Sequence, residues 1–141
     1  MRYYPYSLPA YLHEPTSEHF EVRYISEREG EGVVSLASFE PGDVVFVFTG
    51  FLIHEITQYT LQIEDGLYIH DPFFMGKVLH SCDPNCSVDM KTLTFTANRP
   101  IRPGDLVTMD YETTEDYLFK SFECNCRAPN CRGLIAGRLN H

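Results

Sequence analysis

The chain has 141 residues, the length of one domain, and a formal charge of −9, with 43% hydrophobic and 13% aromatic residues. This acidity repels phosphate, so we expect no direct contact with nucleic acid, whereas a basic protein or peptide is a partner that the charge would attract. The longest apolar run, residues 44–48, is far below the roughly 20 residues of a membrane span, so no membrane partner is expected. The charge could equally serve solubility alone.

The predicted elements are mostly short strands. Residues 1–18, rich in Tyr and Pro without a period, should form an arm that packs on the domain through Tyr3, Tyr4, Tyr6 and Tyr11. Alternating or β-branched apolar runs predict strands at residues 20–24, 33–36, 43–48, 58–63, 67–69, 93–97 and 106–109. Asp65-Gly66 predicts a hairpin. Residues 71–86 should be irregular because of their prolines, and residues 113–122 should hold one short helix.

The five cysteines favour a metal site over disulfides, because disulfides are rare inside cells and we expect an intracellular protein. That expectation rests on the first residues, which lack the apolar core of a signal peptide; the protein would be cytoplasmic if bacterial and also nuclear if eukaryotic or viral. Structural zinc sites use four ligands, often thiolates, and three thiols lie within eight residues: Cys124, Cys126 and Cys131. The fourth would be Cys82 or Cys86, and spacing does not choose between them. Scattered buried cysteines, the alternative, explain the clustered triplet badly.

Four segments in chain order carry a family resemblance. They are Gly30-Glu31-Gly32-Val33 followed by Phe39-Glu40-Pro41-Gly42-Asp43, then His80-Ser81-Cys82-Asp83-Pro84-Asn85-Cys86, then Pro103-Gly104-Asp105-Leu106-Val107-Thr108-Met109-Asp110-Tyr111, and last Cys124-Asn125-Cys126 to Cys131-Arg132-Gly133. Together they resemble the motifs of SET-domain protein-lysine methyltransferases that end in a post-SET zinc motif. The form is minimal, similar to small viral and bacterial relatives.

The resemblance implies a fold and an activity. The fold would be mainly β, a SET-domain (β-clip) arrangement of small curled sheets with a C-terminal pseudoknot beneath the His-Ser-Cys loop. Its parts would be an arm (1–18), the SET domain (19–112) and the post-SET zinc-binding tail (113–141). The activity would be S-adenosylmethionine-dependent methylation of a lysine side chain in a protein or peptide, histone or not.

The resemblance also assigns roles to residues. Tyr111 would be catalytic, its hydroxyl orienting the methyl group and the amine. Cofactor-binding positions would be Gly30, Glu31, Gly32, Leu79, His80, Asn125 and Leu134. The substrate channel would include Phe48 and Met109. By the same match Cys82 becomes the fourth ligand of a structural Zn²⁺ with Cys124, Cys126 and Cys131, while Cys86 is a spare thiol and Asn85 a structural residue of the knot.

Some positions depart from the family pattern. Leu79 replaces an Asn, Phe48 a Tyr, Met109 a Phe or Tyr, and Gly76-Lys77 an Arg-aromatic pair. The loss of hydroxyls predicts a product beyond monomethyl-lysine. The helical insert beside the peptide groove is reduced to residues 54–57, so the arm or a second subunit of a homodimer would complete that groove. The alternative is a catalytically weak or inactive SET-fold binding module. A zinc hydrolase fits poorly, because four thiolates leave no position for water.

Overall fold

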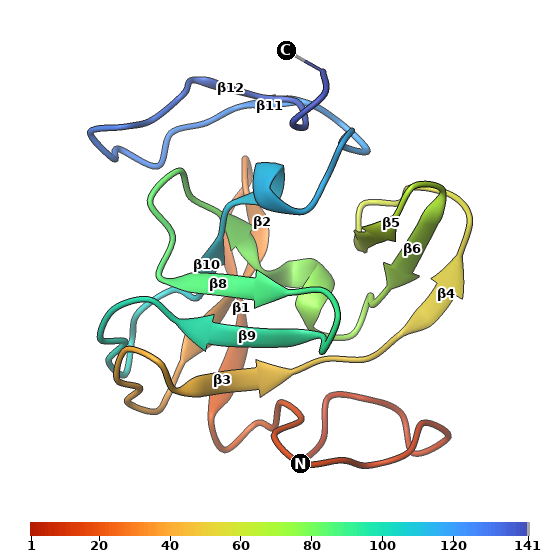
Figure 1. Cartoon of the computed structure of the whole chain (residues 1–141). Coiled ribbons are helices and arrows are strands. Elements are labelled where there is room, and N and C mark those ends of the chain that lie inside the picture. The colour runs from red at the N-terminus through yellow and green to blue at the C-terminus, as the bar shows by residue number, and fades with distance from the viewer. Residues whose placement is uncertain (141) are drawn as a thin grey trace.

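The protein is built from short strands, as a computed structural model that describes residues 1–140 shows (Figure 1). The strands are β1 (Phe20–Ser26), β2 (Gly30–Ser35), β3 (Val44–Val47), β4 (Phe51–Ile53), β5 (Thr60–Glu64), β6 (Leu67–His70), β7 (Leu79–His80), β8 (Cys86–Asp89), β9 (Thr94–Ala97), β10 (Thr108–Met109), β11 (Phe122–Glu123) and β12 (Leu134–Ile135). Two single-turn 3-10 helices occur, η1 (Met75–Lys77) and η2 (Tyr111–Thr113).

The strands form small separate sheets. Two have three strands, in the orders β3-β9-β8 and β4-β6-β5, and three are pairs, β1-β2, β7-β10 and β11-β12. All are antiparallel except β7-β10. The seven strand predictions are confirmed, and the hairpin between β5 and β6 turns at Gly66, whose φ of 77° favours glycine. The strands β4, β7, β8, β11 and β12 were not predicted, and residues 71–86 are more ordered than expected because they contain η1 and β7.

Aromatic rings form the centre of the core. Phe46 of β3 stacks on Phe95 of β9 with ring centroids 4.3 Å apart, and it meets Phe74 edge-on at 4.8 Å. Phe20 of β1 packs on Phe74 from another side at 5.2 Å. These rings are at most 2% exposed. Burial of a side chain of this size contributes roughly 1.5–3 kcal/mol, so the rings join three separate strands into one core.

The arm packs on the domain through three of its four expected tyrosines. Tyr4 is 2% exposed, and its hydroxyl donates to Asp71 Oδ2 at 2.6 Å. The hydroxyls of Tyr3 and Tyr11 donate to backbone carbonyls of the domain, at 2.6 and 3.1 Å. Tyr6 differs from the prediction: it is 84% exposed, and only the Arg2 guanidinium lies over its ring, at 5.8 Å. Figure 1 shows the arm running beneath β3.

The chain crosses itself beside the His80 loop. β10 lies parallel to β7, and the backbone N–H of Ser81 donates to the carbonyl of Met109 at 2.9 Å. The Asn85 side chain joins the two segments, because its Nδ2 donates to the Leu106 carbonyl at 2.8 Å and its Oδ1 accepts from the Thr108 N–H at 2.9 Å. This is the crossing expected of the C-terminal pseudoknot.

The tail does not form the helix predicted for residues 113–122. Only η2 is helical, and the chain then bends toward β5. The Gln62 amide explains the change: its Oε1 accepts from the backbone N–H of Asp116 at 2.8 Å, and its Nε2 donates to Asp116 Oδ2 at 2.8 Å. Gln62 therefore holds both the backbone N–H and the carboxylate of Asp116, and the chain after η2 does not continue the helical turn.

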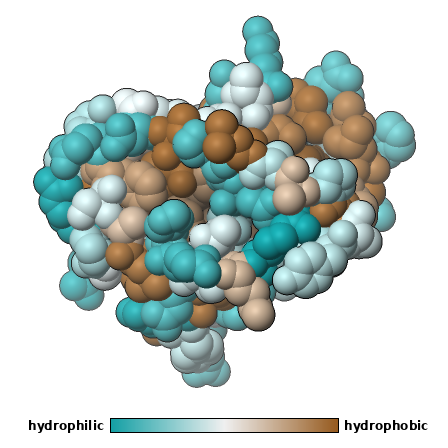
Figure 2. All heavy atoms as spheres, turned by 90° about the horizontal axis from the view of Figure 1, so that it is seen from below, coloured by the Kyte–Doolittle hydropathy of each residue, from teal (hydrophilic) through white to brown (hydrophobic). Residues whose placement is uncertain are grey.

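Within residues 1–140, neither helical turn approaches the length and apolar character of a membrane-crossing helix. Seen from the side of the arm, apolar residues form several separate groups with hydrophilic residues between them (Figure 2).

Candidate active site and metal centre

Four thiols gather where the tail meets the crossing. The sulfur atoms of Cys82, Cys124, Cys126 and Cys131 all lie within 4.8 Å of one another. The Sγ atoms of Cys82 and Cys124 are 3.9 Å apart, close to the roughly 3.8 Å expected between two thiolates on a tetrahedral zinc with Zn–S bonds of about 2.3 Å. Cys86 lies apart, buried in β8 opposite Ala97. The donor set therefore fits zinc, and the geometry chooses Cys82 over Cys86.

The four thiols differ in how readily they ionise, because burial raises the pKa of Cys82 and Cys124, whereas that of Cys126 is lowered. The backbone N–H of Arg132 points at Cys82 Sγ from 3.4 Å. Burial acts to raise the pKa of Cys126, but backbone N–H groups at Ala128 and Cys82 and the neighbouring thiols outweigh it and lower the pKa to about 6. A thiolate is the form that binds metal.

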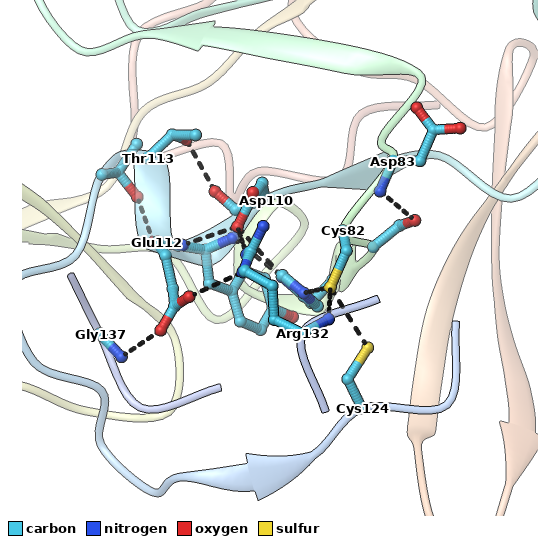
Figure 3. A network of polar contacts seen from close by, with 12 residues as sticks. Cys82, Asp83, Asp110, Glu112, Thr113, Cys124, Arg132 and Gly137 are labelled. Carbon is cyan, nitrogen blue, oxygen red and sulfur yellow. Dashed lines mark hydrogen bonds and ion pairs between the residues drawn. The ribbon is translucent and has the colours of Figure 1, made fainter. Parts of the chain in front are cut away.

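Carboxylates clamp the tail onto η2 (Figure 3). The Arg132 guanidinium donates to Asp110 Oδ1 at 2.6 Å and to Glu112 Oε1 at 3.1 Å. The other oxygen of Glu112 accepts from the backbone N–H groups of Ala136 and Gly137 at 3.1 and 3.0 Å. The tail is thus fixed at two places, by the thiols within residues 124–131 and by the bonds from Glu112 to residues 136 and 137.

His80 connects the thiols with Tyr111. Its Nδ1 accepts the backbone N–H of Tyr111 at 3.0 Å, so in the neutral ring the proton is on Nε2, which lies 3.4 Å from Cys82 Sγ. Burial lowers the pKa of His80, which keeps the ring neutral. The imidazole can therefore support the Cys82 sulfur while it fixes the backbone at the start of η2.

A cavity of about 960 Å³ opens between the body of the domain and the tail. Leu79, His80 and Tyr111 line it from the crossing, and Phe122 and Asn125 line it from the tail. The rings of His80, Tyr111 and Phe122 pack on one another with centroids 5.2 to 6.0 Å apart. One wall is therefore aromatic, and the cavity is large enough for a nucleoside-sized molecule.

A smaller cavity of about 250 Å³ also has Tyr111 in its wall. Its walls are mainly apolar, with Met109 and Met75 among them, and Glu115 is its buried acid. The two cavities share three residues, Tyr111, Lys120 and Phe122. The Tyr111 hydroxyl donates to the Val78 carbonyl at 2.6 Å, and burial raises its pKa, so it stays protonated at neutral pH. This arrangement can present two molecules to each other across one tyrosine.

Comparison with known proteins decides the family. The family model described as "SET domain" matches residues 30–112. The chain belongs to the SET-domain family. The SET match contains β7 and β10, the two strands of the crossing, and it also contains Met109 and Tyr111. The tail, with three of the thiols, follows the matched residues.

Relatives of the SET domain include named methyltransferases. "Methyltransferase flvH" of Aspergillus flavus is 42% identical over 83 residues, which is 57% of this chain and 47% of that protein. "Histone-lysine N-methyltransferase ash1" of Drosophila melanogaster is 28% identical over 143 residues, covering 82% of this chain and 6% of that protein. This chain thus spans less than half the length of these relatives.

A solved structure of KRYPTONITE in complex with mCHG DNA and SAH is similar to this SET domain, with a TM-score of 0.68 and 26% identity, and it covers 82% of this chain and 28% of that chain. A second KRYPTONITE structure, with mCHH DNA, an H3(1-15) peptide and SAH, has a TM-score of 0.64 at 24% identity over 82% of this chain and 29% of that chain.

The SET fold brings five of the ten expected catalytic, cofactor-binding and channel residues to the two cavities. Leu79, His80 and Asn125 line the larger cavity, Met109 lines the smaller one and Tyr111 lines both. The other five were expected at the site but line neither cavity: Phe48, Leu134, Gly30, Glu31 and Gly32.

Phe48 and Leu134 lie outside both cavities. Phe48 is 1% exposed and packs on Phe46 and Phe95, because β3 turns this side chain into the aromatic core. Leu134 is 50% exposed, and its strand pairs with β11 so that Phe122 faces the larger cavity in its place.

The glycine turn acts through its neighbours. Arg28 and Glu29, just before it, line the larger cavity, whereas the Glu31 side chain reaches Lys77 at 3.4 Å. A Cβ on Gly32 would lie 2.9 Å from side-chain carbons of Leu79 and Ile25. Gly32 therefore supports the cavity by letting β2 approach Leu79, without lining it.

Among the site residues that were not predicted are Glu115, Lys120 and Phe122. They lie in the segment for which a helix was expected, and no residue spacing marks them as neighbours of Tyr111. The one available signal was their position between the Asp-Tyr motif and the cysteine triplet, which the family resemblance brings together.

Proposed function

We propose that this chain transfers a methyl group from S-adenosylmethionine to an amine, and that the amine is a lysine side chain of a protein or peptide. The observation that carries the proposal is the meeting of two cavities at Tyr111. A displacement reaction needs the nucleophile and the methyl donor on opposite sides of the transferred group, and two cavities with a shared wall supply that alignment.

The larger cavity suits the cofactor. Leu79, His80 and Asn125 would hold it from two segments, and the faces of Phe122 and Tyr111 tolerate a sulfonium charge. When bound there, the cofactor would supply an electrophilic methyl group. The KRYPTONITE structures were solved with SAH, the demethylated form of this cofactor, which supports the assignment.

The smaller cavity suits a lysine side chain. Its apolar walls exclude water, which lowers the pKa of an amine from its usual value of about 10.4 and favours the neutral nucleophile. The Tyr111 hydroxyl, fixed by the Val78 carbonyl, keeps oxygen lone pairs that can accept from an amine N–H. The histone-lysine methyltransferases among the relatives, the H3 peptide of KRYPTONITE and the charge of −9 support a basic peptide substrate.

Zinc would complete the site structurally. We propose that the four thiols hold one Zn²⁺, with Cys82 as the ligand from the crossing and the other three from the tail. Four thiolates close the coordination sphere, so the metal would join the two walls of the larger cavity and take no chemical part.

Tyr111→Phe tests the mechanism. We expect the affinity for S-adenosylhomocysteine, measured by calorimetry, to stay within about twofold, and the rate of methylation of a histone H3 peptide, followed by mass spectrometry, to fall about 100-fold, because the hydroxyl orients the transition state. Tyr117→Phe is the matched control, since Tyr117 is 48% exposed and lines neither cavity. Equal rates for Tyr111→Phe and the parent would remove this tyrosine from the mechanism.

The same experiment separates the enzyme from a binding module. A parent protein that binds peptide but neither S-adenosylhomocysteine nor S-adenosylmethionine would favour the module. If the parent is active, the flexible Met109 wall predicts products beyond monomethyl-lysine, which a time course with excess cofactor would reveal.

A further inference from the structure

Glu115 is a buried carboxyl group in the smaller cavity. It is 3% exposed and lines the same space as Tyr111 and Met109. An ionised carboxylate is costly to bury unless a cation or several hydrogen bonds compensate for the loss of water. A group of this kind therefore needs a partner.

In the described part of the chain, no basic side chain forms a direct ion pair with this carboxylate, although Lys120 lines the same cavity and the Arg138 charge acts on it. The nearby Arg138 guanidinium is engaged elsewhere, with Asp116 Oδ1 at 2.5 Å and the Thr113 carbonyl at 3.1 Å. The Glu115 Oε2 accepts from the backbone N–H of Gln62 at 2.7 Å, which holds the carboxyl group at the cavity wall.

We propose that Glu115 receives the cationic amine of the acceptor in the smaller cavity and takes its proton before methyl transfer. This inference rests on the proposed function. It assigns to this cavity a selectivity for cationic amines over uncharged side chains of the same shape, and it gives the amine proton a destination.

The proton balance is simple. An ammonium group enters beside the carboxylate, one N–H proton moves to a carboxylate oxygen, and a neutral amine faces a neutral carboxylic acid. The nitrogen lone pair would then form its bond to the methyl carbon as the carbon–sulfur bond of bound S-adenosylmethionine breaks and S-adenosylhomocysteine is left. The positive charge would pass from sulfur to nitrogen, and the carboxylic acid would release its proton to water when the product leaves. No reactant beyond the amine and S-adenosylmethionine is required.

The surroundings of Glu115 make this transfer feasible. Burial raises its pKa to about 7, against the lowering effects of the Gln62 N–H, the Thr114 hydroxyl and the Arg138 charge. The same burial lowers the pKa of an amine that enters the cavity, so the two values approach each other. The titratable and charged groups near this carboxyl are Tyr68 of β6, Tyr111 of η2, and Asp116, Lys120 and Arg138 of the tail.

Glu115→Gln separates this role from a structural one. The amide oxygen can still accept from the Gln62 N–H, so a purely structural Glu115 predicts little change. The probes are n-butylammonium and the uncharged 1-pentanol, titrated by NMR into protein saturated with S-adenosylhomocysteine. We expect the parent to bind n-butylammonium more tightly than 1-pentanol, and Glu115→Gln to lose at least tenfold in n-butylammonium affinity with unchanged 1-pentanol affinity.

Asp116→Asn is the matched control, because it removes a neighbouring charge that lies outside both cavities. It should keep the preference for n-butylammonium. Equal n-butylammonium affinity in Glu115→Gln and the parent would overturn the proposal. Should Glu115→Gln fail to fold, the Glu115 carboxyl carbon of the parent can be titrated by ¹³C NMR: saturating n-butylammonium should lower its pKa by at least one unit, and no shift would also overturn the proposal.

These outcomes differ from failure of the proposed function. Absence of S-adenosylhomocysteine binding in the parent, measured by calorimetry without any amine, would refute the methyltransferase assignment. The amine titration tests only the role of Glu115, so the two failures can be told apart.

Discussion

The body of the domain and its tail are held together by different forces. In the body, residues 20–109, strands from distant parts of the chain meet through buried aromatic rings, with Phe46 at the centre. In the tail, residues 113–140, the two strands have two residues each, and thiols and charged hydrogen bonds surround one small apolar cluster at Ile135. Figure 1 shows the tail as a long irregular loop above the sheets.

This difference places the candidate active site at the boundary between the body and the tail. The larger cavity has one wall from the crossing and one from the tail, and Tyr111 stands where the two regions join. A wall made by cross-links can detach while the body stays folded, because local stability follows local packing. Cofactor binding should therefore depend on the thiols and stability on the rings.

Removing the metal ligand from the crossing should have the largest effect. We expect Cys82→Ser to lose bound zinc and to weaken S-adenosylhomocysteine binding at least 100-fold, because the tail would no longer close the cavity. Hydrogen exchange should rise over residues 113–140 and stay low in β3 and β9. Metal analysis, calorimetry and hydrogen exchange by mass spectrometry measure the three effects.

Cys86→Ser is the control, since Cys86 lies in β8 away from the cluster. The opposite result, with zinc lost in Cys86→Ser and kept in Cys82→Ser, would show that the thiol assignment is wrong. If Cys82→Ser loses zinc but binds the cofactor as the parent does, the tail does not form the second wall.

Phe46→Ala should act on the other region. Removing a fully buried ring that contacts Phe74 and Phe95 should lower the free energy of unfolding by about 3–5 kcal/mol, measured by urea denaturation. The folded fraction should still bind one zinc, because Phe46 and the four proposed metal ligands belong to different buried clusters. Phe119→Ala, at a 62% exposed ring of the tail, should change the free energy by less than about 0.5 kcal/mol. Similar losses for the two variants would contradict the division between body and tail.

The sequence predicted the body better than the tail, because strands and buried rings leave a local sequence pattern and the cross-links of the tail do not. β-branched and aromatic runs such as residues 43–48 report strand structure directly, because such side chains favour the pleated backbone. The tail has no such period, and its path depends on Gln62, which lies more than 50 residues away in the chain. A contact at that separation leaves no local pattern.

Apart from the cysteine triplet, which its spacing marks as a metal site, the candidate site was predictable only through the family resemblance. Cys82 could not be told from Cys86 by spacing, although His80 and Tyr111 stood in recognisable motifs. Phe48 shows the limit of carrying roles over by position: without a hydroxyl, its ring packs in the core among Phe46 and Phe95. Glu115 has no motif of its own, and only the folded chain reveals its burial.

Glu115 should also carry a stability cost that depends on pH. Its pKa in the folded protein, about 7, is above the ordinary value of 4.5, so the folded state binds the proton more tightly and loses stability as pH rises from about 4.5 to 7. Glu115→Gln removes this loss. At pH 8 the variant should be more stable than the parent by up to about 3 kcal/mol, at 1.36 kcal/mol per pKa unit, and the difference should vanish near pH 4.5.

Melting temperatures of the parent and Glu115→Gln between pH 4.5 and 8 check the sign. Asp116→Asn should differ from the parent by a constant amount over this range, because Arg138 and Gln62 lower the pKa of Asp116 below its ordinary value of 3.8 and its contribution is lost only at lower pH. A difference between Glu115→Gln and the parent that is constant with pH would mean that folding does not raise the pKa of the Glu115 carboxyl group.

Arg132→Lys should have the smallest effect, and it tests how the two regions are joined. The Arg132 guanidinium spans two carboxylates, Asp110 and Glu112, from two different nitrogens, whereas a lysine ammonium is a single point charge that cannot hold the same fork. The backbone N–H that points at the Cys82 sulfur stays in either case, so zinc should remain bound. Because the Arg132 side chain is 36% exposed, solvent screens the pair and the loss should be about 1 kcal/mol, or roughly fivefold in S-adenosylhomocysteine affinity by calorimetry.

Arg102→Lys is the control, because its pair with Glu40 is more exposed and lies in the body, so cofactor affinity should not change. If Arg132→Lys binds the cofactor as the parent does and still loses zinc, the fork serves the metal site; if it keeps both, the thiols alone hold the tail.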